Sequence, residues 1–384
     1  MRVENLCKVM RKVGRKNGFL SIGSASDRAV ILVLFAFFAS SVVSAQSIAG
    51  RWTEERANQW FEEKGWPVGC NYVPSTAINT IEMWQAETFD AKTINREMGW
   101  AEKLGFNTMR IFLNALVYES APEGFKSRFD EVLGILAKHK MRALVTFFTN
   151  GGNPDGRLGK QMDAVQGLHS PGWKQSPGMD IVNDPTKWGG IERYVKDILT
   201  THKDDDRILM WCLYNEPENL QGGKVNTLPL LRAVFQWARE VNPSQPLTAP
   251  MWGIPCQADW GSNLPIVCFL GENCDVMSFH CYESTDVMKK FINYLKQFRR
   301  PLVCTEYLAR TQGNTFESCL PLLRHENVGA ISFGLVQGKC GFYYPWSSKE
   351  GSPEPPVWFH DILRSDGTPY SKAEVDFVKS ITKP

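Results

Sequence analysis

Two kinds of apolar pattern alternate along the chain. Short apolar runs that end at a polar or turn residue are typical of buried parallel strands. Between these runs, apolar residues recur every three or four positions, which predicts helices with one buried face. We expect strands at residues 67–73, 106–114, 142–148, 207–216, 246–252, 275–282, 302–307 and 330–336. We expect helices at residues 51–64, 91–104, 125–140, 185–203, 228–241, 285–299 and 371–381.

This alternation indicates a parallel sheet, and eight repeats predict an α/β protein whose sheet closes into a (β/α)8 TIM barrel. An open doubly wound sheet is the alternative. Such a sheet is expected to carry a Gly-rich phosphate-binding turn after its first strand, and residues 73–76, Val-Pro-Ser-Thr, lack one. No repeat or composition break marks a second domain, so residues 46–384 are predicted to form a single domain.

The first 45 residues have the pattern of a secretory signal peptide. A basic leader precedes an apolar run at residues 29–43, and small residues up to Ala45 offer a cleavage site before Gln46. A retained membrane anchor is the alternative, but about 15 apolar residues are short for a membrane span. We therefore expect cleavage after Ala45 and a protein that is secreted or periplasmic.

The charge of the chain changes when this leader is removed. The whole sequence has 43 Lys and Arg and 41 Asp and Glu residues, of which the leader holds seven and two. The remaining 36 basic and 39 acidic residues give a formal net charge of −3. This balance does not suggest binding to nucleic acid or to an anionic membrane. We expect a monomer without stable membrane association after cleavage.

Nine cysteines remain after the leader, an odd number. Four lie inside predicted strands, where a free cysteine behaves as a small apolar residue: Cys70, Cys212, Cys281 and Cys304. Five lie in loops or at the ends of elements and can form one or two disulfides in an oxidising compartment: Cys256, Cys268, Cys274, Cys319 and Cys340. Their pairing stays open. No Cys or His spacing suggests zinc, and we expect neither a metal nor a cofactor.

The fourth predicted strand ends in a carboxylate. Its apolar run, residues 208–214, leads to Asn215-Glu216-Pro217, and Pro217 ends the strand because proline cannot donate to a ladder. A carboxylate at the exit of a buried strand is costly unless it has a purpose. We therefore interpret Glu216 as a catalytic acid. The alternative is a helix cap, a role that Glu218 or Asn219 can also fill.

Glu306 is a second carboxylate in the same kind of position, after the apolar residues 302–305. Active sites of such barrels lie at the carboxyl ends of the strands, and the fourth and seventh strands stand on opposite sides of the ring. We therefore expect Glu216 and Glu306 to face each other. Two facing carboxyl groups cleave glycosidic bonds, with retention at about 5–5.5 Å and inversion at about 6.5–9.5 Å. For Glu306 alone, an ion pair with Arg310 is the alternative.

These motifs resemble the retaining β-glycoside hydrolases of clan A, nearest in pattern to the family 5 cellulases and mannanases. The resemblance covers about residues 68–336. The motifs that carry it are Arg110 on the second predicted strand, Asn215-Glu216-Pro217 on the fourth, His280-Cys-Tyr282 on the sixth and Glu306 on the seventh. It implies hydrolysis of O-glycosidic bonds in a plant-type β-glycan (cellulose-, mannan- or xylan-like), or in oligosaccharides derived from one, by double displacement.

The resemblance also implies a role for each matching residue. Glu216 would be the general acid and then the general base, and Glu306 the nucleophile. Asn215 would bind the sugar's 2-hydroxyl, Tyr282 would tune a carboxylate, and Arg110 would keep Glu306 ionised. Tryptophans offer apolar area and an N–H donor for sugar stacking. The full set of predicted substrate-binding residues is Asn71, Trp84, Arg110, Trp173, Asn215, Trp252, His280, Tyr282 and Trp346.

Two positions depart from the family pattern. Many members carry a His near the end of the third strand, where this chain has Phe147-Phe-Thr-Asn150. Many end the eighth strand with Trp, where this chain has Gly334-Leu-Val336, which leaves Trp346 as a substitute. The sugar therefore stays open. So does the mode of cleavage: an open groove lined by Trp173 in the long loop 149–184 favours endo action, and closure of that loop over the mouth favours exo action.

Three other functions use the same barrel. An inverting or non-glycosidic hydrolase can employ the same carboxylate pair. A non-catalytic carbohydrate-binding barrel is expected to have lost Glu216 or Glu306, and both are present. An exo-acting β-glycosidase on short oligosaccharides is the alternative within hydrolysis. In each case the expected partner is a polysaccharide or an oligosaccharide.

Overall fold

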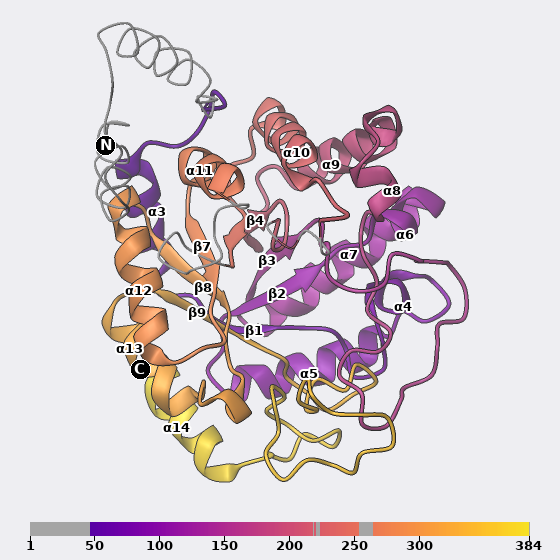
Figure 1. Ribbon diagram of the computed structural model, residues 1–384, viewed down its shortest axis with the longest axis vertical. Coiled ribbons are helices and arrows are strands. Elements are labelled where there is room, and N and C mark those ends of the chain that lie inside the picture. The colour runs from indigo at the N-terminus through magenta and orange to yellow at the C-terminus, as the bar shows by residue number, and fades with distance from the viewer. Residues whose placement is uncertain (1–46, 218, 220–222, 253–263, 384) are drawn as a thin grey trace, which may run out of the picture. The chain divides into compact units, whose positions relative to one another are not determined.

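The computed structural model describes residues 47–217, 219, 223–252 and 264–383. The predicted signal peptide lies outside these residues. From Ser47 onward the chain is one compact unit, in which strands occupy the centre and helices surround them (Figure 1). Among the described helices, none has the length and the hydropathy needed to cross a membrane.

The described strands form one parallel sheet in the order β5-β4-β3-β2-β1-β9-β8-β7-β6. They are β1 (Val68–Asn71), β2 (Thr108–Phe112), β3 (Arg142–Thr146), β4 (Ile208–Cys212), β5 (Leu247–Thr248), β6 (Pro250–Met251), β7 (Met277–His280), β8 (Leu302–Glu306) and β9 (Gly329–Phe333). Only Ala249 separates β5, which pairs with β4, from β6, which pairs with β7. These two short strands are halves of the predicted fifth strand, interrupted where Pro250 has no N–H to donate. The chain itself thus closes the ring, and the (β/α)8 prediction is confirmed.

Helices follow the strands, and all seven predicted helices are present with ends shifted by a few residues. They are α3 (Glu54–Lys64), α5 (Ala91–Lys103), α7 (Pro122–Lys138), α9 (Trp188–Thr201), α10 (Thr227–Val241), α12 (Thr285–Leu295) and α14 (Lys372–Thr382). Five further α-helices were not predicted: α4 (Thr80–Trp84), α6 (Ala115–Ser120), α8 (Met179–Val182), α11 (Leu264–Asn273) and α13 (Phe316–His325). The first three are too short to show a helical period. In the other two, an almost continuous apolar run and an internal Pro321 conceal it.

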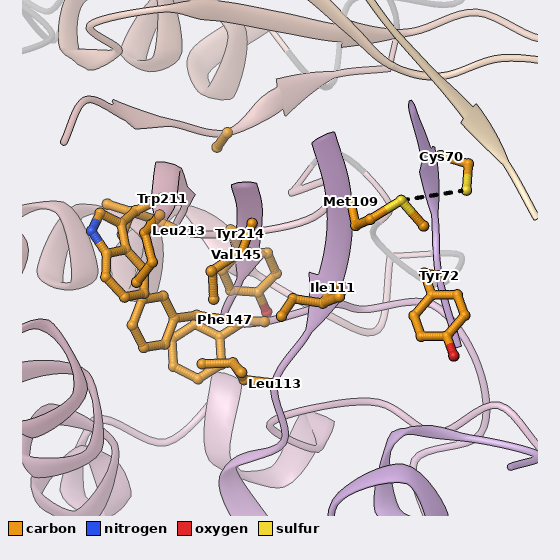
Figure 2. Close-up of a cluster of buried hydrophobic side chains, with 14 of the residues drawn as sticks. Cys70, Tyr72, Met109, Ile111, Leu113, Val145, Phe147, Trp211, Leu213 and Tyr214 are labelled. Atoms are coloured by element: carbon orange, nitrogen blue, oxygen red, sulfur yellow. Dashed lines mark hydrogen bonds between the residues drawn. The ribbon is translucent and has the colours of Figure 1, made fainter. Parts of the chain in front are cut away.

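The core has two parts, because the strands alternate their side chains between the inside and the outside of the barrel. Outward-facing residues such as Met109, Val145 and Trp211 pack between the sheet and the helices, and Figure 2 shows this cluster across neighbouring strands. Inward-facing residues, including Leu144 and Val303, pack with aromatic side chains of the segment that contains α3. The end of the barrel next to α3 is therefore filled by apolar side chains, and polar side chains lie at the other end.

The described cysteines are all free. Those predicted to lie in strands, Cys70, Cys212, Cys281 and Cys304, are buried as expected. Of the disulfide candidates, Cys268, Cys274, Cys319 and Cys340 are unpaired, and Cys256 lies outside the described residues. Cys274, Cys319 and Cys340 are buried themselves, so they contribute to packing in the same way as the strand cysteines.

Candidate active site

The two predicted catalytic carboxylates lie at the same end of the barrel. Glu306 is the last residue of β8, and Glu216 follows the end of β4 by four residues. One oxygen of each carboxylate and one nitrogen of His280 lie within 4.8 Å of one another. The structure therefore brings together the pair that the sequence placed on opposite sides of the ring.

The alternative readings of these carboxylates are wrong in the described structure. The next helix after Glu216, α10, begins at Thr227 with Asn226 before it, so Glu216 caps no helix. Arg310 forms its ion pair with Glu374, with nitrogen–oxygen distances of 2.5 and 2.7 Å. It is therefore not the partner of Glu306.

Two donors hold the carboxylate of Glu306. The Arg110 Nη1 donates to Glu306 Oε1 at 2.6 Å, and the Tyr282 hydroxyl donates to Oε2 at 2.8 Å. Only 5% of Glu306 is exposed, so both hydrogen bonds lie in a water-poor environment where charge-assisted contacts are strong. A guanidinium and a phenol on opposite oxygens stabilise the negative charge and fix the orientation of the carboxylate.

Arg110 lies behind the site and connects three strands. Its side chain is fully buried in the barrel, and its Nη1 also donates to Asn71 Oδ1 at 2.7 Å. Its Nη2 donates to Asn215 Oδ1 at 2.6 Å. Because a guanidinium presents its donors in a rigid fork, Arg110 fixes the positions of Glu306 and Asn215 relative to each other.

Glu216 has a different environment. Burial raises the pKa of its carboxyl from 4.5 to about 7, although the nearby charge of Arg110 acts in the opposite direction. Its backbone has φ of +46°, an unusual value for a residue with a side chain. A carboxyl with a pKa near 7 holds a proton at neutral pH and can donate it.

His280 lies between the two carboxyl groups. Its Nδ1 is 2.8 Å from Glu216 Oε1 and 3.4 Å from Glu306 Oε2. Burial lowers the pKa of this imidazole to about 3, although the charge of Glu306 opposes the shift. The ring is therefore neutral at physiological pH and adds no positive charge that would favour ionisation of Glu216.

Two cavities flank the carboxylate pair. The small cavity has a volume of about 230 Å³ and is lined by Phe112, Thr149, Gly151, His169, Ser170, Trp173, Asn215, Glu216, Tyr282, Glu306, Phe333, Trp346 and His360. The large cavity, about 380 Å³, is lined by Glu216, Trp252, His280, Cys281, Tyr282, Glu283, Phe291, Gln312 and Trp346. Glu216, Tyr282 and Trp346 belong to both linings, so they form the boundary between the cavities.

Most of the predicted substrate-binding residues line these cavities. Trp173 and Asn215 line the small cavity, Trp252 and His280 line the large one, and Tyr282 and Trp346 line both. Trp252 and Trp346 expose 45% and 51% of their surface, which leaves indole area available for stacking.

Three of the predicted substrate contacts line neither cavity. Trp84 is fully buried, because it packs against two phenylalanines of α7 and donates its indole N–H to the Phe112 carbonyl at 2.7 Å. Asn71 donates its amide to the carbonyls of Thr305 and Ser332 and accepts from Arg110, so it supports the barrel interior. Arg110 itself lies beside Glu306 as predicted, but it lines neither cavity.

Several lining residues were missed at the sequence level. His169 lies in the long loop 149–184, and His360 lies in the segment after β9, where no strand or helix pattern marks a rim position. Phe112 and Phe333 are the last residues of β2 and β9. Their place at strand ends was a usable signal, but phenylalanine in an apolar run reads as core.

The cluster of Glu216, His280 and Glu306 also has the spacing of a cation site. Such a site needs neutral imidazole and ionised carboxylates, and the imidazole of His280 is neutral. However, the guanidinium of Arg110 already occupies one face of Glu306 at 2.6 Å and repels a second cation. Proton transfer and nucleophilic attack therefore fit this cluster better than metal binding does.

Comparisons of sequence find little. No family model matches the chain. A β-glucuronidase from Paenibacillus borealis is 24% identical over 116 residues, which make up 29% of this chain and 19% of that protein. The match therefore spans less than a fifth of the curated relative.

Comparisons of structure cover most of the chain. An exo-β-1,4-mannosidase from Opitutaceae bacterium strain TAV5 has a TM-score of 0.57 and 17% identity, over 83% of this chain and 59% of that one. GH5_18 from Streptomyces cattleya, in complex with GlcNAc, has a TM-score of 0.54 and 12% identity, over 83% and 80%. A hyperthermostable endo-1,4-β-D-mannanase from Thermotoga petrophila has a TM-score of 0.53 and 12% identity, over 83% and 99%. The chain thus has the (β/α)8 fold of these proteins, and the resemblance predicted from its motifs is confirmed at the level of the fold.

Proposed function

We propose that this protein is a retaining β-glycoside hydrolase. The observation that carries the proposal is the carboxylate pair: one oxygen of Glu216 and one oxygen of Glu306 lie within 4.8 Å of each other. Retaining glycosidases keep their carboxyl groups about 5–5.5 Å apart, whereas inverting enzymes need about 6.5–9.5 Å to admit a water molecule. Direct attack by one carboxylate on the sugar is therefore the favoured chemistry.

The environments of the two groups support a division of labour. Glu306 is held as an anion by Arg110 and Tyr282, so it is the nucleophile that attacks the anomeric carbon. Glu216, with a pKa raised to about 7, protonates the departing oxygen. When Glu306 becomes a glycosyl ester, its negative charge is lost and Glu216 gives up its proton more easily. It then acts as the base that activates water for the second step.

Asn215 supports the reaction from the side of the small cavity. Its Oδ1 accepts from Arg110, and its amide nitrogen is 3.3 Å from Thr149 Oγ1. The amide therefore has a second N–H available to a hydroxyl of the sugar. A hydrogen bond to the 2-hydroxyl strengthens as positive charge develops on the ring, which lowers the barrier selectively.

The two cavities correspond to the two sides of the bond. The small cavity holds Asn215 and Glu306 and therefore receives the sugar that is attacked. The large cavity holds His280 and Trp252 beside the acid and receives the leaving group. An exposed indole at this second position supports a leaving group that is itself a sugar, because pyranose faces stack on tryptophan.

The loops around the small cavity support exo action. The loop 149–184 is joined to the segment after β9 by four hydrogen bonds: Ser170 N to Cys340 O at 2.7 Å, His169 Nδ1 to Tyr344 O at 2.8 Å, Gly351 N to Gln166 O at 2.9 Å, and Gln166 Nε2 to Ser352 O at 3.3 Å. His169 and Ser170 of this junction line the small cavity, so the joined loops narrow the space for a longer chain beyond the attacked sugar. We therefore favour removal of single sugars from a chain end over cleavage inside a β-glycan.

Three measurements test this function. Proton NMR of the first-formed sugar should show the β-anomer, and the α-anomer as first product would exclude double displacement. Digestion of β-1,4-manno- and β-1,4-gluco-oligosaccharides labelled at the reducing end should shorten them by one sugar at a time. Early release of mixed internal fragments would instead indicate endo action. EDTA should leave the rate unchanged, because no step of this reaction needs a metal ion.

We also propose that the mature protein is exported after cleavage at Ala45. The basic leader and apolar run at residues 29–43 support this proposal. Mass spectrometry of the protein recovered from the culture medium and from the cells tests it. A mature chain that begins at Gln46 is the expected result, and an intact leader on the active protein would contradict it.

A further inference from the structure

Two histidines line the small cavity without touching either catalytic carboxylate. His169 comes from the loop 149–184 and His360 from the segment after β9, and their ring centroids are 5.2 Å apart. Aromatic side chains surround them, with Phe333 5.0 Å from His360 and Trp346 6.3 Å from His169. The two imidazoles thus lie in a largely aromatic part of the cavity lining.

The hydrogen bonds of the two rings fix which nitrogen carries the proton. The Nδ1 of His169 is 2.8 Å from the Tyr344 carbonyl, and the Nδ1 of His360 contacts the Leu308 carbonyl. A carbonyl oxygen only accepts, so each Nδ1 must be the donor. In a neutral ring the remaining nitrogen, Nε2, is then an acceptor with a free lone pair.

Both rings are neutral at physiological pH. Burial lowers the pKa of His169 to about 4 and lowers the pKa of His360 well below 6.5. His360 is 99% buried, and neither Nε2 has a hydrogen-bond partner among the described residues. Both acceptors are therefore open to a hydrogen bond from a ligand that brings a donor.

Among the described residues, the lining of the small cavity offers no cation to an acidic sugar. None of the described residues that line it is Lys or Arg, and its ionisable acids are Glu216 and Glu306. Arg110 is fully buried and its guanidinium is engaged by Asn71, Asn215 and Glu306. A carboxylate entering this cavity would lose its hydration and meet two lone pairs and a carboxylate pair.

We propose that His169 and His360 determine specificity at this site: each Nε2 accepts a hydrogen bond from a hydroxyl of the bound sugar, and together they exclude uronic acids. The inference rests on the proposed glycosidase function and adds the class of sugar that the small cavity selects, an uncharged one with two hydroxyls directed at the imidazoles. It also separates this chain from the β-glucuronidase with which it shares a 116-residue segment.

The first test compares two 4-nitrophenyl β-glycosides that differ only at C6: the neutral hexoside cleaved fastest by the wild type and its uronic acid counterpart. The neutral substrate should have a kcat/KM at least about a thousandfold higher. In His169→Arg, which places a cation in the cavity wall, this ratio should fall by roughly tenfold or more. His325→Arg, at an exposed position at the end of α13, is the matched control and should leave the ratio unchanged.

The second test pairs each histidine with a hydroxyl. His169→Phe and His360→Phe keep a ring of similar size but remove the acceptor, so each should lower kcat/KM for the full sugar about 5- to 20-fold. On the deoxy analogue that lacks the partner hydroxyl, the same variant should show no further loss. A merely structural histidine would give equal losses on every deoxy analogue. His169 is the safer of the two variants, because it is only partly buried.

The outcomes separate this inference from the proposed function. Efficient cleavage of the uronide that still depends on Glu216 and Glu306 would overturn the inference and leave the glycosidase function intact. Equal losses across the deoxy series for both variants would overturn it as well. Activity that does not depend on the two carboxylates would overturn the proposed function itself.

Discussion

Glu216 and Glu306 are the same residue type, one oxygen of each lies within 4.8 Å of the other, and apart from His280 their contacts differ. Glu306 receives a guanidinium and a phenol, one on each oxygen. Glu216 lies 2.8 Å from the neutral imidazole of His280, and burial raises its pKa to about 7. Environment alone therefore makes one carboxyl a stable anion and the other a proton donor.

The difference also shows what the barrel does for the site. Arg110, on β2, donates hydrogen bonds to Glu306 and to Asn215, which follows β4. One buried cation therefore orients two groups that act on the same sugar. Glu216 instead leaves β4 through a backbone turn with positive φ, which frees it from that network. Two glutamates can thus take different roles because the network of Arg110 fixes Glu306 and does not include Glu216.

The largest effect should follow from removing the nucleophile. Glu306→Ala should lower kcat by about 10⁴- to 10⁶-fold, because it removes the carboxylate that forms the glycosyl ester. Added azide should restore part of the rate and give an α-glycosyl azide, detected by NMR. Near wild-type turnover by this variant would contradict the assignment, and Glu350→Ala at an exposed site is the matched control.

Removing the acid should have a smaller effect that depends on the leaving group. Glu216→Ala should lower kcat/KM about 10²- to 10⁴-fold for substrates with poor leaving groups, which need protonation. It should lower the rate of the first step little for 2,4-dinitrophenyl glycosides, which do not. Steady-state and burst kinetics across an aryl glycoside series measure this, and a loss that is uniform across the series would contradict the acid role.

The wild-type pH profile gives the same comparison without mutation. Glu216 is protonated below its pKa of about 7, so kcat/KM should fall as the pH rises above 7. In Glu216→Ala, measured with a good leaving group, that alkaline limb should disappear. Persistence of the limb would assign it to another group.

Replacement of the two glutamates by glutamine should change the stability of the protein at pH 8 in opposite directions. The pKa of Glu216 is higher in the folded protein (about 7) than its ordinary value of 4.5, so folding stability is lost as the pH rises from 4.5 through 7. Glu216→Gln should abolish this loss. The gain in stability of the variant over the wild type should therefore be larger at pH 8 than at pH 4.5, by up to about 3 kcal/mol. Urea unfolding at both pH values measures it.

Glu306→Gln is the matched control for that experiment. It leaves the buried Arg110 without its anionic partner, so it should destabilise the protein at pH 8 by roughly 3–5 kcal/mol. Equal stability changes in the two glutamine variants would contradict the claim that their environments differ.

The smallest effect concerns the large cavity. Trp252→Ala removes a half-exposed indole from its wall, so it should raise KM for oligosaccharides about 3- to 10-fold and leave kcat nearly unchanged. The KM for a 4-nitrophenyl glycoside should change less, since that leaving group is not a sugar. Trp84→Ala, which removes a buried tryptophan, should lower stability. It should not raise KM for oligosaccharides more than KM for the 4-nitrophenyl glycoside.

The sequence predicted the barrel and the carboxylate pair because both rest on local patterns. An apolar run that stops at Glu216-Pro217 or at Glu306 reports its own strand end, and parallel topology then brings the ends together. Trp84 and Asn71, predicted as substrate contacts, line neither cavity. Residue type and a position near the rim of the barrel do not reveal which way a side chain points. His169 and His360 were missed because long loops place residues through tertiary contacts, here with the carbonyls of Tyr344 and Leu308.

One measurement tests the central claim most directly. The enzyme is incubated with a 2,4-dinitrophenyl 2-deoxy-2-fluoro-β-glycoside, whose fluorine slows both steps while the good leaving group still permits the first. Peptide mass spectrometry should then find one fluoroglycosyl group on Glu306 and none on Glu216. Attachment to Glu216, or steady hydrolysis with inversion and no covalent label, would contradict the account.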